Sequence, residues 1–406
     1  MMQRSIFCKA RRVLAAALLL SVFSNTPLGA AEAEIPFKQW LQGVQREAQS
    51  RGISQKFLDT ALAGVRPIKR VIELDRRQPE FTLTFWNYLD RSINDERIRR
   101  GREMLAKHGK LLKKTAAKFG VQPRFIVAFW GLESNYGKHT GAFSVLGAVA
   151  TLAHDPRRSR FFRQQLLAAL TIMSKGDVRL DAKGSWAGAM GNFQFIPTTY
   201  KDFAVDDDGD GRRDMWQNFP DMFASASNYL ARSGWRRGWT WGREVKLPQG
   251  FSLELTGLKV RKPLSQWRAL GIKRMDGGNL SSEETEASVV LPAGYNGPAF
   301  LVYQNFRTIL NWNRSILYAI AVGHLADRLV GGERFKSPRP TEEQPLSRTD
   351  VKDMQRKLSA KGFLTEGADG VVGPNTRSAI KAFQKSNNLP PDGYPSFGLL
   401  ERLRGP

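Results

Sequence analysis

Residues 125–137, FIVAFWGLESNYG, run from a bulky apolar stretch into a single acid, Glu133. If this stretch is a helix, Phe129 and Trp130 lie about one turn before the acid and share its face. A carboxyl group at the end of an apolar helix loses hydration, which raises its pKa and keeps it protonated near neutral pH. Such a group suits a general acid for glycosidic bond cleavage. Taken alone, an exposed acid beside a tight turn explains the pattern equally well.

A second unusual segment covers residues 185–197, SWAGAMGNFQFIP. Gly188 and Gly191 leave room for close approach of backbone, either to another helix or to a ligand. The flat ring of Phe195 offers a face for stacking on a sugar, and Gln194 can hydrogen-bond hydroxyl and acetamido groups. From spacing alone, a tightly packed helix junction is the better explanation of the small residues.

The N-terminus predicts a secretory signal over residues 1–31. The apolar stretch Val13–Phe23 follows a basic region, and small residues at 29–31 suit cleavage before Glu32. The apolar stretch is too short for a transmembrane helix, although an uncleaved membrane anchor is the alternative. Cys8 is the only cysteine and precedes the apolar stretch, so we expect neither a lipoprotein nor disulfides in the mature chain.

The chain is strongly basic, with a formal net charge of +24 that falls to about +20 once the four basic residues of the signal are removed. Nucleic acid is the usual partner of such a charge, but a secreted chain meets little of it. We therefore expect no nucleic-acid partner. Membrane surfaces, cell-wall peptide carboxylates and acidic polysaccharide are the anionic partners outside the cytoplasm. Because the charge is spread along the chain, it indicates general attraction to an anionic matrix.

The fold class is predicted to be mainly α, with a large helical body over residues 32–335. Helical patterns alternate with glycine and proline signals up to about Gly242, and a further helix is predicted over residues 316–329. Between them, short β-type runs at 288–291 and 300–303 predict a small sheet inserted into, or packed on, the helices.

The proline-bearing stretch 336–345 predicts a semi-rigid linker to a tail over residues 346–406. The tail has the apolar spacing of three short helices. Residues 369–376, DGVVGPNT, resemble the three-helix peptidoglycan-binding domain, as do the spaced matches that follow, Ala379, Phe383-Gln384, Leu389 and Asp392-Gly393. Residues 394–397 depart from the usual short glycine-containing turn. A helical dimerisation or spacer module is the alternative.

Taken together, the segments of the body resemble the lytic murein transglycosylase B family (glycoside hydrolase family 103) from about Pro36 to Leu329. The resemblance rests on QPEF at 78–81, the Glu133 segment at 125–137, GAMGNFQ at 188–194, the acidic loop at 206–214 (the Asp206 loop), NYL at 228–230, NF at 305–306 and WNRS at 312–315. It implies a lysozyme-like helical catalytic domain.

By this resemblance, the catalytic acid is Glu133. The substrate-contacting positions fall on Ser185, Gln194, Phe195, Tyr229, Trp312 and Asn313, and Tyr88 is a further cleft residue. Trp312 stands where many members have Tyr, so we expect stacking to survive and a phenolic hydrogen bond to be lost.

The implied reaction is non-hydrolytic cleavage of the β-1,4 bond between N-acetylmuramic acid and N-acetylglucosamine, leaving 1,6-anhydro ends. Glycosidases usually need two carboxylates, whereas Asp155 and Asp177 look like solvated acids near turns or helix ends. One acid suffices if the sugar supplies the nucleophile, and the reaction needs no cofactor. The alternatives are a lysozyme-type muramidase and a non-catalytic peptidoglycan-binding protein.

Residues 206–214, DDDGDGRRD, are a candidate metal site. Oxygen ligands at alternate positions with glycine at the sixth match the first half of an EF-hand loop and favour calcium. The twelfth position is Gln217 rather than Glu, so a later acid would close the site. The predicted ligands of this structural calcium are Asp206, Asp208, Asp210, Arg212 and Asp221. A surface turn or a helix cap without an ion is the alternative.

These predictions describe a soluble periplasmic enzyme that is not a lipoprotein and is expected to be a monomer. Its predicted partners are peptidoglycan glycan strands, with peripheral association to the membrane or to other cell-wall enzymes as a further expectation.

Overall fold

The computed structural model describes residues 35–76, 83–340 and 344–405. The predicted signal over residues 1–31 and the segment 78–81 lie outside the described residues. Within the described part of the chain, none of the helices is long and apolar enough to cross a membrane.

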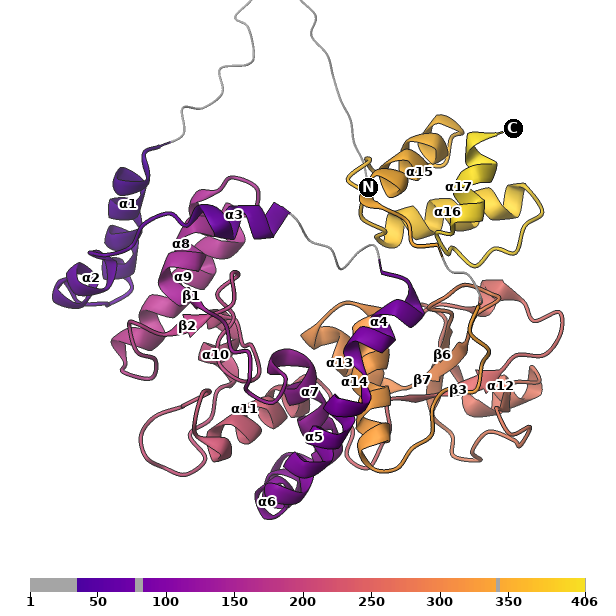
Figure 1. Cartoon of the computed structure of the whole chain (residues 1–406), viewed down its shortest axis with the longest axis horizontal. Helices are drawn as coiled ribbons and strands as arrows, with labels where there is room; N and C mark the ends of the chain where they lie inside the picture. The colour runs from indigo at the N-terminus through magenta and orange to yellow at the C-terminus, as the bar shows by residue number, and fades with distance from the viewer. Residues whose placement is uncertain (1–34, 77–82, 341–343, 406) are drawn as a thin grey trace, which may run out of the picture.

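The predicted mainly-α architecture is confirmed (Figure 1). The helices of the body are α1 (Phe37–Ser50), α2 (Gln55–Leu62), α3 (Lys69–Arg76), α4 (Phe85–Ser92), α5 (Asp95–Lys107), α6 (Gly109–Phe119), α7 (Pro123–Ser134), α8 (Val145–His154), α9 (Ser159–Ser174), α10 (Pro197–Phe203), α11 (Phe219–Arg232), α12 (Leu264–Ala269), α13 (Gln304–Trp312) and α14 (Ile316–Leu329). The tail contributes α15 (Arg348–Ala360), α16 (Pro374–Ser386) and α17 (Phe397–Arg404).

Helix α7 lies at the centre of the body, in contact with α5, α6, α11 and α14. Pro123 begins the helix, where its missing N–H costs nothing, and Gly120 before it ends α6 in the left-handed conformation. All residues from Phe125 to Gly131 are buried. Each fully buried large side chain contributes about 2 kcal/mol, so this apolar stretch fixes α7 in the core and with it the position of Glu133.

Two sheets accompany the helices, and the strand-like runs predicted only the larger one. Strands β1 (Phe143–Ser144) and β2 (Lys183–Gly184) form a small antiparallel pair. A five-stranded antiparallel sheet with the order β4-β6-β7-β3-β5 is inserted between α11 and α13. Its strands are β3 (Gly242–Lys246), β4 (Lys262–Pro263), β5 (Lys273–Arg274), β6 (Glu286–Val290) and β7 (Ala299–Val302).

The larger sheet joins two cores. Leu301 pairs with Val289 on one side and with Arg243 on the other. One apolar cluster of the sheet surrounds Trp267, while Phe300 and Val302 belong to the main helical core. The sheet is therefore anchored to the helices that carry the site.

The tail has a core of its own, built from α15, α16 and α17 around Met354, Leu358 and Ile380. Ser347 and Asp350 form a capping box at the start of α15. The tail lies beside the sheet region (Figure 1), where Asp392 accepts a hydrogen bond of 2.9 Å from the Tyr295 backbone N–H.

The connecting segment lies against the body. The backbone N–H groups of Lys336 and Ser337 donate to the Glu244 carboxylate at 2.7 and 2.9 Å. Arg339 makes a bidentate pair with Asp90 at 2.8 and 2.9 Å. These contacts hold residues 336–339 in a defined path between body and tail.

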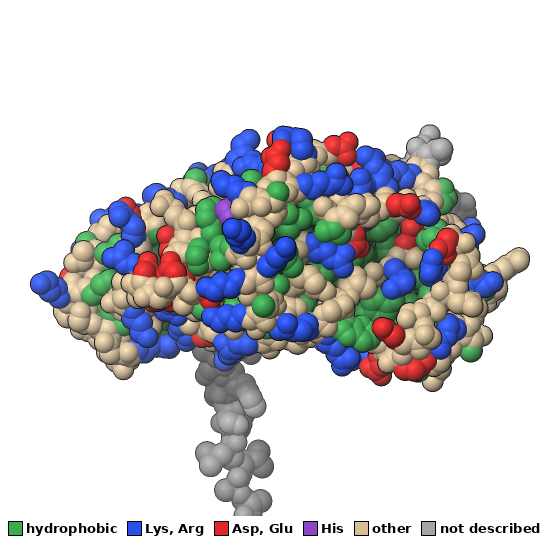
Figure 2. Space-filling view, turned by 90° about the horizontal axis from the view of Figure 1, so that it is seen from below, with side chains coloured by type: hydrophobic (Ala, Val, Ile, Leu, Met, Phe, Trp, Pro, Cys, Tyr) green, Lys and Arg blue, Asp and Glu red, His purple; other side chains and the backbone are tan. Residues whose placement is uncertain are grey.

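Basic side chains are spread over the surface. The face drawn in Figure 2 shows Lys and Arg side chains scattered among acidic, neutral and apolar ones. On that face the basic side chains form no single stripe, in line with the spread of charge along the sequence.

Candidate active site

Glu133 is half-buried at the C-terminal end of α7. The helix ends because Asn135 adopts a left-handed conformation with φ 51°, followed by Tyr136 and Gly137, also at positive φ. The Ser134 hydroxyl accepts a hydrogen bond of 2.9 Å from the Gly137 N–H, which closes the turn. This turn presents Glu133 at the edge of the core.

Two donors from different helices hold one oxygen of Glu133. Trp312, at the end of α13, donates its indole N–H to Oε1 at 2.9 Å. Tyr318, in the first turn of α14, donates its hydroxyl to the same oxygen. Burial raises the pKa of the Tyr318 phenol well above its usual value, and the nearby Glu133 charge raises it further. Tyr318 therefore stays protonated and remains a donor.

Tyr318 is a site residue that the sequence analysis missed. It stands in the apolar run Ile316–Leu329, where its spacing fits a core residue. The sequence feature that could have indicated its role is the hydroxyl group in an otherwise apolar helix, because a buried Tyr usually needs a hydrogen-bond partner.

An aromatic wall surrounds Trp312. Its ring centroid lies 4.5 Å from that of Phe129, 5.3 Å from that of Phe195 and 5.0 Å from that of Tyr229. The expected loss of a phenolic hydrogen bond at Trp312 is offset, because the indole N–H bonds directly to Glu133. The tryptophan is thus surrounded by aromatic rings and held at its nitrogen by the acid.

Of the predicted substrate-contacting residues, Phe195 and Tyr229 form part of this wall. The Phe195 side chain is only 2% exposed, so its ring supports Trp312 and Tyr229 and offers little face to a ligand. The Tyr229 hydroxyl donates to the Asn311 carbonyl oxygen at 2.8 Å, tying α11 to α13.

Ser185 and Gln194 lie in the loop between β2 and α10. The Ser185 hydroxyl accepts from the Ala189 N–H at 3.0 Å. Gln194 has φ 50°, and its amide donates to the carbonyl oxygens of Gly191 and Thr140 at 2.8 and 3.2 Å. These bonds orient both side chains before any ligand binds.

Asn313 and Tyr88 lie at the margins of the site. Asn313 is exposed, and its side-chain oxygen accepts from the Ser315 N–H at 3.0 Å, next to the start of α14. Tyr88, on α4, is close enough to Tyr318 to raise the pKa of its phenol, as is Tyr229. Trp312 thus contacts Glu133 directly, Tyr229 packs against Trp312, and Tyr88 lies near Tyr318.

The small residues of the 185–197 loop serve protein packing. A Cβ on Gly191 would lie 2.3 Å from the Met215 carbonyl oxygen. Ala189 of the loop approaches strand β2 so closely that a Cβ on Gly184 would lie 2.3 Å from the Ala189 carbonyl oxygen. This is the packing interpretation that spacing favoured, with other backbone rather than a ligand at close range.

Asn192 is a second residue that the sequence analysis did not single out. Its buried side chain accepts from the Trp130 indole N–H at 2.7 Å and donates to the Trp216 carbonyl oxygen at 2.8 Å. Its backbone N–H donates to the Met215 carbonyl oxygen at 2.8 Å. Asn192 therefore links the helix of Glu133 to the end of the Asp206 loop.

The two other acids considered as catalytic partners are held by arginines. Asp155 pairs with Arg76 at 3.0 Å. Asp177 accepts from the Arg213 guanidinium at 3.1 Å. The prediction that these two acids are solvated is wrong, because their side chains are only 11% and 9% exposed. Each carboxylate has an arginine partner, which gives it a structural role.

The Asp206 loop brings its carboxylates together. One oxygen from each of Asp206, Asp208, Asp210 and Asp221 lies within 4.8 Å of the others. Arg212 follows in the loop, with its N–H bonded to Asp210 at 2.8 Å. An all-oxygen set of this size fits a hard cation such as calcium. Burial raises the pKa of Asp221 to about 6, and the charges of Asp208 and Asp206 add to this shift.

A helical body with an acid held in an aromatic wall, joined to a three-helix tail, defines a lysozyme-like enzyme that acts on a polysaccharide. The family model "Transglycosylase SLT domain" matches residues 36–327, and the model "Putative peptidoglycan binding domain" matches residues 347–403. The chain belongs to the transglycosylase SLT domain family and is a peptidoglycan lytic transglycosylase. The predicted fold class, function and family resemblance are confirmed at this level.

Similar proteins agree with this assignment. The chain is 28% identical to the membrane-bound lytic murein transglycosylase B of Escherichia coli over 71% of this chain and 82% of that protein. It is 47% identical to SltB3 of Pseudomonas aeruginosa, solved in complex with NAG-anhNAM-pentapeptide, with a TM-score of 0.88 over 91% of this chain and all of the other. The Escherichia coli transglycosylase Slt35 in complex with calcium is 28% identical, with a TM-score of 0.62 over 73% of this chain and 93% of that one.

Proposed function

We propose that Glu133 acts first as general acid and then as general base in cleavage of the bond between N-acetylmuramic acid and N-acetylglucosamine. The observation that carries this proposal is the pair of donors, Trp312 and Tyr318, on Oε1 of Glu133. Donors from two helices fix the orientation of the carboxyl group, and a fixed acid needs little reorganisation at the moment of proton transfer.

The chemistry needs one carboxyl group. Glu133 donates its proton to the bridging oxygen as the bond from that oxygen to C1 of the muramic acid breaks. The resulting carboxylate takes the proton of the C6 hydroxyl, whose oxygen then bonds to C1. The product is a 1,6-anhydro end, and the acid is regenerated without water. The substrate-contacting roles of Ser185, Gln194, Tyr229, Trp312, Asn313 and Tyr88 belong to the same proposal. Phe195, predicted as a further contact, is too buried for that role and supports Trp312 instead.

Mass spectrometry of a murein digest tests the proposed reaction. Anhydro ends weigh one water less than the reducing ends left by a muramidase. Incorporation of oxygen-18 from the solvent into the new ends would contradict ring closure and favour hydrolysis.

We further propose that the chain divides into a signal at 1–31, a catalytic domain at 32–335, a linker at 336–345 and a binding domain at 346–406. The basic N-terminal region and apolar stretch support export, and the periplasm is the compartment where peptidoglycan is met. The separate core of the tail supports its role as an anchor on the murein.

Deletion of residues 346–406 is expected to lower the affinity for intact murein about tenfold or more, because the second binding module and its avidity are lost. Cleavage of soluble glycan fragments should stay close to that of the full chain. The contacts from tail to body include the pair between Lys381 and Glu254 at 3.4 Å, and exposed pairs of this kind contribute little stability.

Pelleting with murein sacculi, together with turnover of soluble fragments, measures both effects. A thermal melt of the shortened protein is the control for folding. Unchanged pelleting would show that the tail is not the anchor.

We also propose that Asp206, Asp208, Asp210 and Asp221, with the backbone carbonyl of Arg212, hold a structural calcium ion. The convergence of the four carboxylates and the all-oxygen donor set support it. The ion would offset two of the four carboxylate charges of the ligand set. The loop is linked through Met215 and Asn192 to the helix of Glu133.

Calcium at about a hundred times its Kd is expected to raise the free energy of unfolding by about 2.7 kcal/mol at pH 7.5. The gain should shrink as the pH falls through about 6, the pKa of Asp221. The pKa of Asp221 in the folded protein lies above its ordinary value of 3.8. Without the ion, the folded protein therefore keeps a proton on Asp221 at pH values where the unfolded chain has already lost it. Calcium needs the carboxylate and competes with that proton, so its effect is full well above pH 6 and declines as the pH falls through that value.

Thermal melts across pH with calcium, with magnesium and with a chelator measure this dependence. Asp210→Asn should remove most of the calcium effect, whereas Asp202→Asn, at an exposed acid outside the cluster, is the matched control. An equal response to calcium in both variants would contradict the proposed ligand set.

A further inference from the structure

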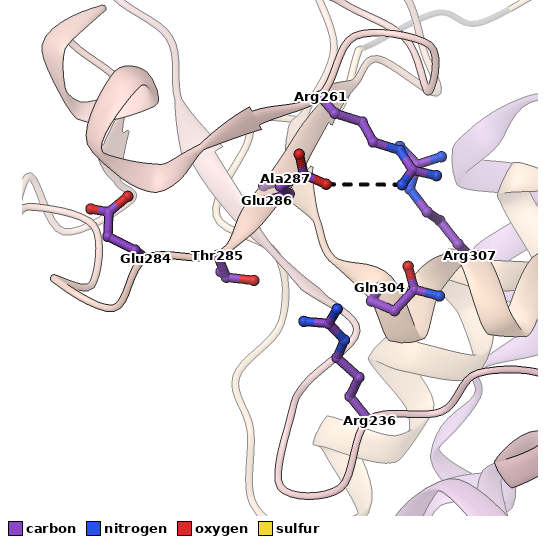
Figure 3. A pocket seen from close by; sticks show the side chains of 8 residues that line it. All are labelled: Arg236, Arg261, Glu284, Thr285, Glu286, Ala287, Gln304 and Arg307. Atoms are coloured by element: carbon purple, nitrogen blue, oxygen red, sulfur yellow. Dashed lines mark ion pairs between the residues drawn. The ribbon is translucent and has the colours of Figure 1, made fainter.

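A basic pocket lies where the five-stranded sheet meets α13, apart from the aromatic wall around Glu133. It has a volume of about 230 Å³. Figure 3 shows Arg261 and Arg307 side by side on one wall and Arg236 with Gln304 below them. Glu286, at the start of β6, extends toward Arg261, with 3.9 Å between the charged atoms.

Arg307 is held by its side chain, and Arg236 by its backbone, through contacts outside the pocket. Arg307 donates to the Leu258 carbonyl oxygen and to the Ser288 hydroxyl, both at 2.7 Å. The backbone of Arg236 is clamped by the buried side chain of Asn305, which accepts from its N–H at 2.7 Å and donates to its carbonyl oxygen at 3.0 Å. Such fixation lowers the entropy lost when a ligand binds.

The charge of the pocket is not balanced from within. Glu284 also lines it, but its carboxylate is engaged by Arg268 at 3.0 Å and by Ser265 at 2.8 Å. Among the lining residues, three guanidinium groups therefore share one carboxylate, that of Glu286, which is not engaged from outside the pocket. Burial lowers the pKa of Arg307, and the like charge of Arg261 lowers it further. An anion placed between these arginines would relieve their repulsion.

We infer that this pocket binds a carboxylate of the peptide stems attached to the glycan. The inference rests on the proposed function, since it concerns the same substrate. A planar guanidinium fork suits a carboxylate, and Glu286 on the wall disfavours a multiply charged phosphate.

The position of the pocket agrees with this ligand. Gln304 and Arg307 lie on α13, whose last residue, Trp312, reaches Glu133. At 1.5 Å per residue, Gln304 and Trp312 are about 12 Å apart along the helix. A peptide stem attached to a sugar near Glu133 extends sideways from the glycan and spans such a distance in a few residues. The sheet region thereby gains a role in selecting glycan that carries peptides.

The double variant Arg236→Gln with Arg261→Gln tests the inference and leaves the structural contacts of Arg307 intact. Its matched control is Arg237→Gln with Lys259→Gln, which removes the same charge from neighbouring exposed positions outside the pocket. KM and kcat are measured on soluble glycan with peptide stems and on the same glycan after the stems are removed.

The expected result is a rise in KM of about fivefold for the peptide-bearing glycan, from the loss of exposed charge-assisted contacts. The kcat, and both constants on stem-free glycan, should stay within twofold of the unchanged protein. The control should match the unchanged protein on both substrates. Equal losses on the two glycans, or no loss on either, would overturn the inference.

A binding measurement separates this inference from the catalytic proposal. Calorimetry on Glu133→Gln with a free stem pentapeptide, and with the same peptide fully amidated, does not require turnover. The free acid should bind at least fivefold more tightly than the amide, and the pocket variant should remove that difference. Displacement of the peptide by inorganic phosphate at concentrations where acetate has no effect would identify a phosphate site instead and refute the carboxylate assignment.

Discussion

Replacing Glu133 by Gln is expected to lower the rate of glycan cleavage by at least about a thousandfold, the scale of a lost general acid. The amide keeps an oxygen that accepts from Trp312 and Tyr318, so the local geometry survives. It has no proton to donate at neutral pH and cannot later accept one from the sugar. Both halves of the proposed ring closure are lost together.

The measurement is the release of anhydro ends from purified murein, followed with time. Pelleting with murein should persist, because the tail and its core are untouched. Glu103→Gln is a matched control, since Glu103 is an exposed acid on α5 paired with Arg99. Retained activity in Glu133→Gln would refute the assignment of the catalytic acid, and loss of activity in the control would point to an indirect effect.

The sequence predicted the elements of the fold that depend on local pattern. The apolar run before Glu133, the start of α7 at Pro123 and the end of α6 at Gly120 are each visible in a few consecutive residues. The strand-like runs predicted the inserted sheet for the same reason, although β6 and β7 begin one or two residues earlier than the patterns did. Local propensity decides such elements, and neighbouring residues report it.

Contacts between distant segments were not predictable in this way. Tyr318 stands 185 residues after Glu133, and nothing in its own helix indicates which group its hydroxyl meets. Asn192 likewise joins Trp130 to the Met215–Trp216 backbone, three segments with no shared pattern. The family resemblance predicted that the aromatic ring of Trp312 stacks on the substrate. The hydrogen bond from its indole N–H to Glu133 depends on how α13 and α7 are placed, which the sequence does not report.

Substituting Gly191 by Ala should destabilise the protein by about 3 kcal/mol, through two effects at one position. Gly191 has φ 66°, a conformation that costs a residue with a side chain about 1 kcal/mol. Its new methyl group would also lie 2.3 Å from the Met215 carbonyl oxygen and 2.7 Å from the Met215 side chain. Backbone cannot swing aside as a flexible side chain does, so we add about 2 kcal/mol for overpacking.

Gly176 separates the two effects. It has φ 82°, and a Cβ there would have no heavy atom within 4 Å. Gly176→Ala therefore carries the conformational cost alone, about 1 kcal/mol. Denaturant unfolding followed by tryptophan fluorescence gives both values, and equal losses would show that the approach of Met215 to Gly191 is not a tight contact.

The Gly191 substitution should also lower the activity of the protein that remains folded. The Gln194 amide donates to the Gly191 carbonyl oxygen at 2.8 Å, and Asn192 binds the same Met215 backbone that the methyl group would displace. A displacement of the Met215 backbone would move Asn192, which accepts a hydrogen bond from Trp130. Because Trp130 lies in α7, this movement would change the position of Glu133 at the end of the same helix. Turnover per folded molecule, measured well below the melting temperature, should fall in Gly191→Ala and hold in Gly176→Ala. Normal turnover in both would mean that the Asn192 link stabilises the fold without positioning the acid.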